Sequence, residues 1–537
     1  MPRLARAATH KRRLAGHGMA ALMALGFAPS VLAQDAPQII KQRCSVCHRA
    51  EAPEHWRRIS HQRKTPEGWW MTIARMQIMH GLQIEKDEQR AVIKYLSDRQ
   101  GLAPSETADF RYALERRLNT FENVEPPKYQ EMCARCHSGA RPLLQRRPQS
   151  EWEHLVHFHL SQWPSVEYSQ MGRDRDWIGM ALTEIAPLLA KQYPHDSDAW
   201  KNWQEKRKSL PSPAGQWPFS AHMPGVGAIR GMMSVKESSP DHFEVEMKGV
   251  RADGKPLSGQ GKAVLYTGHE WRGNIEVDGV RMRQVLSLQD RHLKGRMFET
   301  AHDERGMDFE AIQAAADGQV LTPRLLAVQP AYLKAGMEAE LHLVGRGLAD
   351  QKPDFGPGVE LLSVSADGEQ GLRVKVRTGR DAAVGQRMIR LGSAEALPVS
   401  VYQQVDALKV QPAYAVARIG GNGGSAPKVQ GRFDAEAWGK DAQGKPFRIG
   451  VVPARWSVEP FHEIARRDRD VEFAGQMDEA TGVFMPGDAG PNPKRAMSTN
   501  NAGNLKVLAT IEEGGKQLKG EAQLIVTVPR WNNPPIP

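Results

Sequence analysis

Helical periodicity marks the first third of the chain. Two segments place three residues at i, i+4 and i+7, the spacing of one helix face: Trp69, Ile73 and Met76, then Trp152, Val156 and His159. Thr65 and Pro66 precede the first set and suit the N-cap and the first helical position. Further helices are expected over residues 86–96 and 173–189. We therefore predict that this part of the chain is helical.

The pattern changes near Gly215. Apolar and polar residues alternate in stretches such as 243–247 and 372–376, and Asp-Gly pairs mark tight turns, as in antiparallel sheets. The sequence Val-Gln-Pro-Ala-Tyr occurs at residues 328–332 and again 82 residues later, at 410–414. That offset is a natural length for one β-sandwich domain. We expect a barrel-like domain followed by two immunoglobulin-like sandwiches.

Two Cys-x-x-Cys-His motifs lie in the helical part. Their residues are Cys44, Cys47 and His48, then Cys133, Cys136 and His137. Haem c is attached through such a motif, because the two thiols add to the vinyl groups and the histidine then ligates the iron. The motifs use all four cysteines of the chain. We therefore predict two covalently bound haem c groups.

Motifs with paired cysteines also occur in two other kinds of site. Paired Cys-x-x-Cys segments can close a structural zinc site, and a single Cys-x-x-Cys can serve as a thioredoxin-like active site. A histidine follows the second cysteine in both copies, which favours haem. A thioredoxin-like site is disfavoured because no βαβ pattern surrounds either motif.

The distal iron ligands are inferred from helix faces. Superposing the two periodic segments makes His159 the counterpart of Met76. We predict His48 and Met76 for the first iron, and His137 and His159 for the second. A methionine thioether raises the haem potential, whereas a second imidazole leaves it lower. The two haems would then form a downhill pair for electrons.

Each distal ligand has rivals. Met71 and Met79 compete with Met76. His157 competes with His159, although two residues turn a helix by about 200° and place it on the polar side. No nucleophile–base spacing stands out in the β-rich half, and no catalytic residue is predicted.

The N-terminus predicts export. Five basic residues precede an apolar run over residues 19–27, and Val31-Leu32-Ala33 forms a small-residue cleavage site before Gln34. The run is too short to span a bilayer, so we expect a cleaved signal peptide, a periplasmic location and no membrane insertion. The net charge of +10 is spread along the chain. This favours solubility and steering of an acidic redox partner over nucleic-acid binding.

The predicted fold class is multidomain. An all-α diheme cytochrome c domain is followed by three antiparallel all-β domains, one barrel-like and two immunoglobulin-like. The expected boundaries are 1–33 for the signal peptide, 34–210 for the cytochrome domain, 211–320 for the barrel, and 321–404 and 405–537 for the sandwiches. A chain of 537 residues is long enough for several separate cores.

The whole chain resembles the α subunit of quinohemoprotein amine dehydrogenase. The resemblance rests on the two haem motifs, on the segment from Phe158 to Trp177, and on the order of the domains. It implies a periplasmic αβγ heterotrimer that oxidises primary amines to aldehydes and ammonia. It also implies that this chain passes electrons from a cysteine tryptophylquinone of the γ subunit to azurin or a cytochrome c. With all four cysteines assigned to haem, the quinone must lie in another chain.

Other classes of function stay open at this point. The chain could be the cytochrome subunit of another periplasmic dehydrogenase, such as one with a pyrroloquinoline cofactor, which changes only the substrate. A diheme cytochrome c peroxidase would need one iron without a distal ligand, and the long β-rich half is not expected there. A structural β protein with an electron-storage head is the third alternative.

Overall fold

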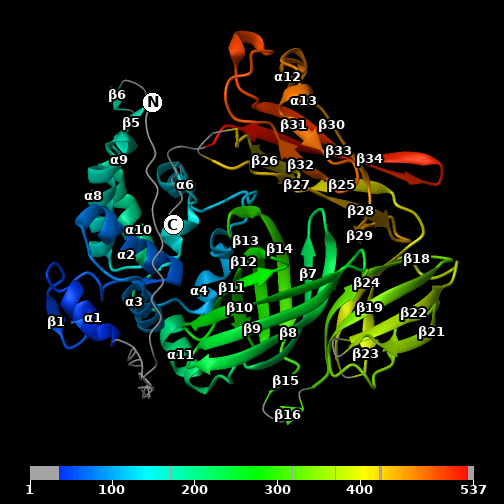
Figure 1. Cartoon of the computed structure of the whole chain (residues 1–537), viewed down its shortest axis with the longest axis horizontal. Helices are drawn as coiled ribbons and strands as arrows, with labels where there is room; N and C mark the ends of the chain where they lie inside the picture. The colour runs from blue at the N-terminus through cyan, green and yellow to red at the C-terminus, as the bar shows by residue number, and fades with distance from the viewer. Residues whose placement is uncertain are drawn as a thin grey trace, which may run out of the picture.

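The computed structural model describes residues 35–529, apart from positions 135, 170, 171, 174, 317, 318, 321, 369, 370, 393 and 423–425. In Figure 1 the helical N-terminal region, in blue and cyan, lies beside a green barrel, and two further sheet regions in yellow and orange follow it. The predicted signal peptide lies outside the described residues. Within the described range, the helices are too short or too polar to cross a membrane.

The N-terminal region is built from two similar halves. Its helices are α1 (Ala36–Arg43), α2 (Pro66–His80), α3 (Lys86–Arg99), α4 (Pro104–Thr107), α5 (Arg111–Leu114), α6 (Pro127–Cys133), α7 (Ala140–Leu143), α8 (Gln149–Gln162), α9 (Trp177–Met180), α10 (Ala186–Gln192) and α11 (Asp198–Lys206). The two periodic segments fall on α2 and α8. Thr65 accepts a hydrogen bond from the Gly68 amide at 3.3 Å, which confirms the predicted N-cap. Separate apolar cores surround Trp69 and Trp152.

Three small sheets lie among these helices, and one of them, β3 with β4, joins the two halves. The two-stranded sheets are β1 (Ala50–Ala52) with β2 (His55–Trp56), β3 (Arg63–Lys64) with β4 (Gln145–Arg146), and β5 (Tyr168–Ser169) with β6 (Gly172–Arg173). In the β3–β4 pair Arg63 lies opposite Arg146, just before α2 and α8 begin. Both guanidiniums bind the buried carboxylate of Glu106, at 2.9 and 3.1 Å. One carboxylate therefore ties the starts of the two helices together.

The second region is a closed antiparallel barrel. Its strands are β7 (Gly215–Met223), β8 (Gly227–Ser239), β9 (His242–Arg251), β10 (Pro256–Tyr266), β11 (Glu270–Val277), β12 (Val280–Gln289), β13 (His292–Glu299) and β14 (His302–Ile312). Each pairs with the next, and β14 pairs with β7 to close the ring. Alternate residues fill the interior, among them Trp217, Phe219 and Trp271. The closed ring leaves no free edge among these eight strands.

The third region packs two sheets around one core. Its strands are β17 (Arg324–Gln329), β18 (Tyr332–Lys334), β19 (Glu338–Arg346), β20 (Pro353–Asp354), β21 (Val359–Ala366), β22 (Gly371–Thr378), β23 (Gly385–Leu391) and β24 (Ala394–Tyr402). The short strands β15 (Ala315–Ala316) and β16 (Gln319–Val320) lead into it from the barrel. β18 pairs parallel with β24.

The fourth region also contains one parallel strand pair. Its strands are β25 (Ala407–Gln411), β26 (Tyr414–Arg418), β27 (Gly431–Arg432), β28 (Asp434–Lys440), β29 (Pro446–Val451), β30 (Arg455–Pro460), β31 (Gly475–Met477), β32 (Val483–Pro486), β33 (Gly503–Glu513) and β34 (Lys516–Thr527). Helices α12 (Glu463–Arg467) and α13 (Asp470–Phe473) lie between β30 and β31. β26 pairs parallel with β34. The repeated Val-Gln-Pro-Ala-Tyr segments thus occupy equivalent places, spanning the β17–β18 and β25–β26 junctions.

The predicted fold class is wrong. The N-terminal region is not an all-α domain, because its helices are short and three small sheets lie among them. The two C-terminal regions are not purely antiparallel, since each contains one parallel strand pair. The last region is not all-β either, because it holds α12 and α13. Strands dominate the described chain. The predicted domain boundaries stay a prediction.

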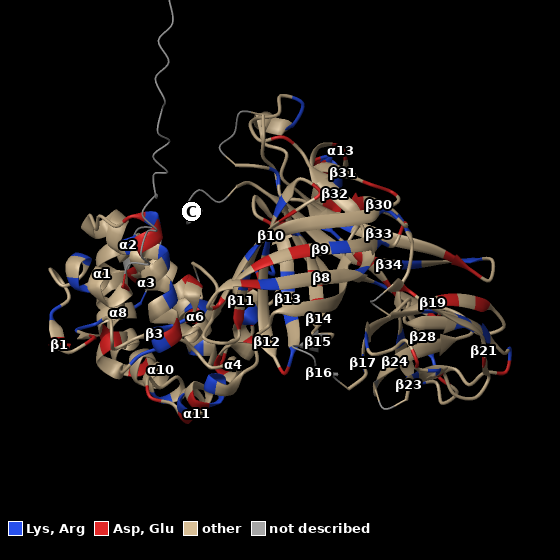
Figure 2. Cartoon of the chain, turned by 60° about the horizontal axis from the view of Figure 1, so that its bottom comes forward, with Lys and Arg blue, Asp and Glu red and all other residues tan. Residues whose placement is uncertain are grey.

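Buried charges fix the helical region on the barrel. Arg111 of α5 and Arg272 of β11 each contact the Glu270 carboxylate at 2.8 Å, and Arg272 also pairs with Glu67 in the first turn of α2. Burial opposes ionisation of Glu270, but the two guanidiniums outweigh it and hold the pKa well below its usual value. The two regions are thus joined by ionised side chains. Elsewhere, Figure 2 shows acidic and basic residues interspersed over helices and strands.

Candidate haem-binding sites

Each Cys-x-x-Cys-His motif begins at the C-terminal end of a helix. α1 ends at Arg43, and the His48 amide donates a hydrogen bond to the Cys44 carbonyl at 2.9 Å. α6 ends at Cys133, the first cysteine of the second motif. In both motifs the first cysteine is half-buried and the second is exposed, and all four are free thiols. Burial raises the pKa of Cys44 to about 11 and that of Cys133 to about 12. Because no disulfide joins the four cysteines, their sulfur atoms are available for covalent attachment.

Backbone carbonyls orient three of the predicted histidine ligands in the same way. His48 Nδ1 lies 3.1 Å from the Arg57 carbonyl oxygen, and His137 Nδ1 lies 2.9 Å from that of Ser138. His159 Nδ1 lies 2.8 Å from the Leu155 carbonyl oxygen. A proton on Nδ1 donated to a carbonyl leaves Nε2 with the lone pair that a metal needs. Burial lowers the pKa of all three imidazoles and favours this neutral form.

The structure brings the rings of His137 and His159 close together. Their ring centroids lie 6.5 Å apart, with 53° between the ring planes. A metal lies about 2 Å from each imidazole nitrogen, which puts the centroids of two axial imidazoles roughly 6 Å apart. The observed separation therefore fits one iron between the rings. His157 is exposed, two residues along α8.

Aromatic rings line this second site. The His159 ring contacts those of Phe158, Trp163 and Trp177 at centroid distances of 6.0, 5.8 and 6.5 Å. The Trp177 indole N–H donates to the Met132 carbonyl at 3.2 Å, which ties the wall to the helix that carries the second motif. A planar macrocycle beside His159 would pack against an apolar wall.

The first site is less closely assembled. Met76 is half-buried on α2, and its sulfur makes no hydrogen bond to His48 within the described residues. His80 lies one turn further along the same helix face and is exposed, yet its charge affects the pKa of His48, so the two are neighbours. His80 is not among the ligands predicted from the sequence. Continuing the i, i+4 spacing from Met76 would have found it.

The methionine rivals of Met76 occupy different surroundings. Met71 lies with its sulfur 4.0 Å from the Arg141 guanidinium, on the side of the second motif. Met79 is 45 % exposed. The ligand sets stay predictions, with the histidine pair the better assembled of the two.

Two half-buried guanidiniums, those of Arg75 and Arg141, lie beside the histidine pair without an acid partner among the described residues. The guanidinium of Arg75 in α2 lies 4.9 Å from the Phe158 ring centroid. The charge of Arg141 lowers the pKa of His137. Burial lowers the pKa of both arginines, and the charge of Arg141 lowers that of Arg75 further. Neither forms an ion pair with a described carboxylate. A charge that is partly withdrawn from water and has no counter-charge is unfavourable, so a bound anion would stabilise this site.

Equivalent cations mark the two halves. Lys64 lies 5.2 Å from the Trp69 ring centroid, and Arg147 lies 5.6 Å from that of Trp152. Burial lowers the pKa of Arg147 to about 9, and Glu151 is its nearest acid at 3.7 Å. The Trp152 indole nitrogen is also buried without a described partner. Haem carries two propionate carboxylates, which these cations and this donor fit.

Four protein-family profiles match the chain. All four describe the α subunit of quinohemoprotein amine dehydrogenase: haem binding over residues 34–200, domain II over 211–314, domain III over 322–403 and domain IV over 408–536. The chain belongs to this family. A quinohemoprotein amine dehydrogenase α subunit is part of an oxidoreductase with other subunits, and its N-terminal region is a haem-binding domain.

Solved structures match only parts of this α subunit. A de novo designed fluorescence-activating β-barrel is 24% identical over 20% of this chain and 95% of its own, with a TM-score of 0.17. Domains EC1-3 of Drosophila N-cadherin are 11% identical over 55% of this chain and 89% of their own, with a TM-score of 0.21. At these TM-scores neither likeness bears on function. A search of curated proteins finds no match.

Proposed function

We propose that this chain is the diheme electron-transfer subunit of a periplasmic quinohemoprotein amine dehydrogenase. The closeness of His137 and His159 supports the proposal. Both imidazoles are oriented by backbone carbonyls, and their ring centroids lie 6.5 Å apart, a separation that suits one iron between them. The complex would oxidise primary amines to aldehydes and ammonia. This chain would relay electrons from a quinone in a partner subunit to a soluble acceptor, either azurin or a cytochrome c.

Each proposed site residue has one role. The assignments are Cys44, Cys47, Cys133 and Cys136 for covalent attachment, His48 and Met76 for the first iron, and His137 and His159 for the second. Bound haem supplies one-electron transfer at each site. The ligand sets give the second site the lower potential, which sets the direction of transfer. Arg75, Arg141 and Arg147 would hold propionates there.

The partners follow from what this chain lacks. All four cysteines are assigned to haem, so the cysteine of a cysteine tryptophylquinone must come from another subunit. We propose an αβγ heterotrimer in which the γ subunit holds that quinone. Export after cleavage near Ala33 and Gln34 would deliver the chain to the periplasm, where thiols can be attached to haem away from the reducing cytosol.

The test uses the native complex from a periplasmic extract. Adding a primary amine without oxygen should reduce the haem iron in the complex, which is seen as a change of the haem absorption bands. The isolated chain should stay oxidised. Reduction by other substrates, with none by any amine, would point to another dehydrogenase. Oxidation of reduced haem by peroxide would instead support a peroxidase and contradict the proposal.

Replacement of Arg75 should lower the potential of the second haem. A cation stabilises the reduced iron, so the neutral variant Arg75→Met is expected to lower this potential by roughly tens of millivolts. The haem spectrum should stay that of a low-spin iron. Redox titration of the purified holoprotein measures the shift. Arg90→Met, which removes a 75 % exposed guanidinium from α3, is the matched control. Equal potentials in the two variants would contradict the assignment.

Separate variants decide the distal ligand of the first haem. Met76→Ala should abolish the methionine-ligand absorption band, and His80→Ala and the exposed-residue control Met79→Ala should leave it unchanged. The reason is that only a coordinated sulfur produces the band. An oxidised spectrum recorded for each holoprotein is sufficient. Loss of the band in Met79→Ala, or its absence from the unmodified protein, would contradict ligation by Met76.

A further inference from the structure

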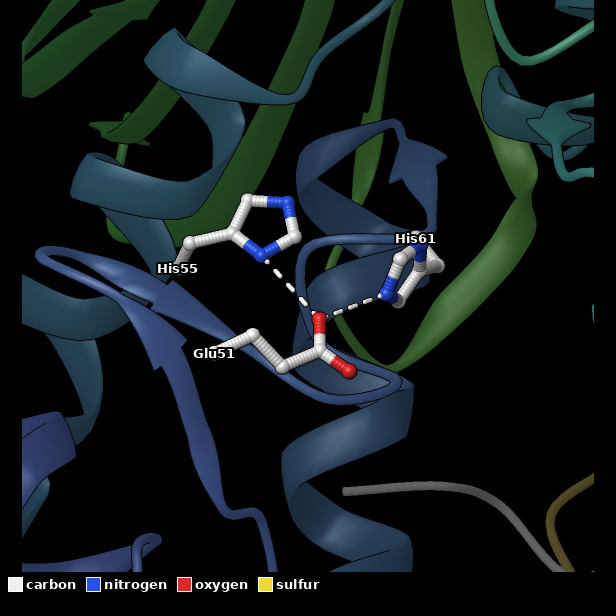
Figure 3. A group of neighbouring side chains, drawn as sticks. All are labelled: Glu51, His55 and His61. Carbon is white, nitrogen blue, oxygen red and sulfur yellow. Dashed lines mark hydrogen bonds and ion pairs between the residues drawn. The ribbon is translucent and has the colours of Figure 1, made fainter.

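Two histidines converge on one carboxylate away from the proposed haem ligands. Glu51 lies in β1, His55 in β2 and His61 in the turn that follows. His55 Nδ1 lies 3.2 Å from Glu51 Oε2, and His61 Nε2 lies 2.9 Å from the same oxygen. Figure 3 shows the two rings directed at that oxygen from different sides. Their planes are nearly perpendicular, at 86°, with centroids 5.2 Å apart.

These donors have the spacing of a metal site. The three ligand atoms lie within 4.8 Å of one another, and no other group of three such donors occurs in the described part of the chain. Zinc lies about 2.0–2.1 Å from nitrogen and oxygen ligands, so neighbouring ligands of a tetrahedral ion are about 3.3 Å apart. The two nitrogen–oxygen distances, 3.2 and 2.9 Å, are close to that value. We propose that Glu51, His55 and His61 bind one divalent transition-metal ion of the zinc type.

The donor set and its exposure define the class of ion. Two imidazoles and one carboxylate suit zinc or copper(II), whereas calcium and magnesium require all-oxygen sites. The three side chains are 38, 44 and 37 % exposed, so a fourth position remains open to water. We therefore expect a site that exchanges its ion with solution.

Local folding brings the donors together. β1 and β2 form a bulged hairpin, which sets Glu51 beside His55. The Ser60 amide donates to the Trp56 carbonyl at 2.9 Å, and this turn returns the chain at His61. Arg57, inside the same turn, supplies the carbonyl that orients His48. A bound ion would therefore brace the segment that positions the proximal ligand of the first haem.

Calorimetry with zinc tests the site. The haem-loaded complex is first treated with EDTA and dialysed, then titrated with zinc chloride. One ion should bind per chain. Outer-shell partners of metal ligands already contribute about 10- to 100-fold in affinity, so His61→Ala, which removes a direct ligand, should weaken binding by at least about 100-fold. Glu51→Gln, which keeps the side-chain shape, should weaken it as well.

A second histidine–glutamate pair provides the control. His292 Nε2 lies 3.2 Å from Glu310 Oε2 on the barrel, without a second histidine in the group. His292→Ala should bind zinc like the unmodified protein. Unchanged haem spectra in every variant show that the chain is folded. Absence of zinc binding, or equal affinity in His61→Ala and His292→Ala, would overturn the proposal.

Discussion

Glu106→Gln is expected to destabilise the folded chain by about 3–5 kcal/mol, the effect of removing one partner from a buried ion pair. The Glu106 carboxylate accepts two bonds from Arg63 at 2.9 Å and one from Arg146 at 3.1 Å. It also accepts from the Ser197 hydroxyl and the Ala103 amide, at 2.9 and 2.8 Å. A glutamine keeps the shape but leaves two guanidiniums buried without a counter-charge.

The effect should depend on pH. Burial raises the pKa of Glu106, but the hydrogen bond from Arg63 and the charges of Arg146 and Arg63 outweigh it and lower the pKa to about 2. A carboxyl whose pKa is lower in the folded state stabilises above its unfolded value and loses that stability as the pH falls. The difference between wild type and variant should therefore be full at pH 7 and shrink below about pH 4.5.

Denaturant unfolding at pH 7 and pH 3 measures both effects. Glu205→Gln is the control, since Glu205 is 75 % exposed and pairs with Lys208 at the surface. That variant should change stability by less than about 0.5 kcal/mol. Because Arg63 and Arg146 lead into α2 and α8, Glu106→Gln should also broaden the spectra of both haems. Equal stability of the two variants would contradict the role given to Glu106.

Local sequence rules predicted the helices that carry the proposed distal ligands Met76 and His159. The cap at Thr65 and the face of Trp69 and Ile73 are properties of adjacent residues, so the sequence contains them. The repeat at 328 and 410 likewise marked equivalent strand junctions. Two-residue strands such as Arg63–Lys64 show no periodicity, because alternation needs a longer run. For that reason the sequence suggested an all-α domain, and that prediction was wrong.

Long-range pairing was not predictable in the same way. The parallel pairs β18–β24 and β26–β34 join segments far apart in sequence, and no alternation pattern distinguishes parallel from antiparallel partners. The sequence also does not show that Arg75 and Arg141 have no acid partner among the described residues. Most arginines are exposed to solvent, and only the structure shows which ones are partly buried and what lies beside them. The ligand sets and domain boundaries stay predictions.

His159→Ala is expected to abolish electron relay through this chain. The variant removes the ring that faces His137 at 6.5 Å, which leaves the second iron with one open position. Its spectrum should change from low-spin to high-spin. The rate of electron transfer from amine to acceptor should fall by more than about 100-fold. The reason is that the axial ligands set the haem potential over a range of roughly 0.8 V, so the loss of one ligand changes that potential strongly. Optical spectra and steady-state turnover of the complex measure the two effects.

His157→Ala is the matched control, because His157 stands on the same helix two residues away and is exposed. It should leave spectrum and turnover unchanged. His159→Met should restore a low-spin iron but raise its potential by more than about 100 mV, since a thioether favours reduced iron. That change would remove the downhill step and slow the relay without opening the site. A high-spin spectrum in His157→Ala, with His159→Ala unchanged, would reverse the ligand assignment.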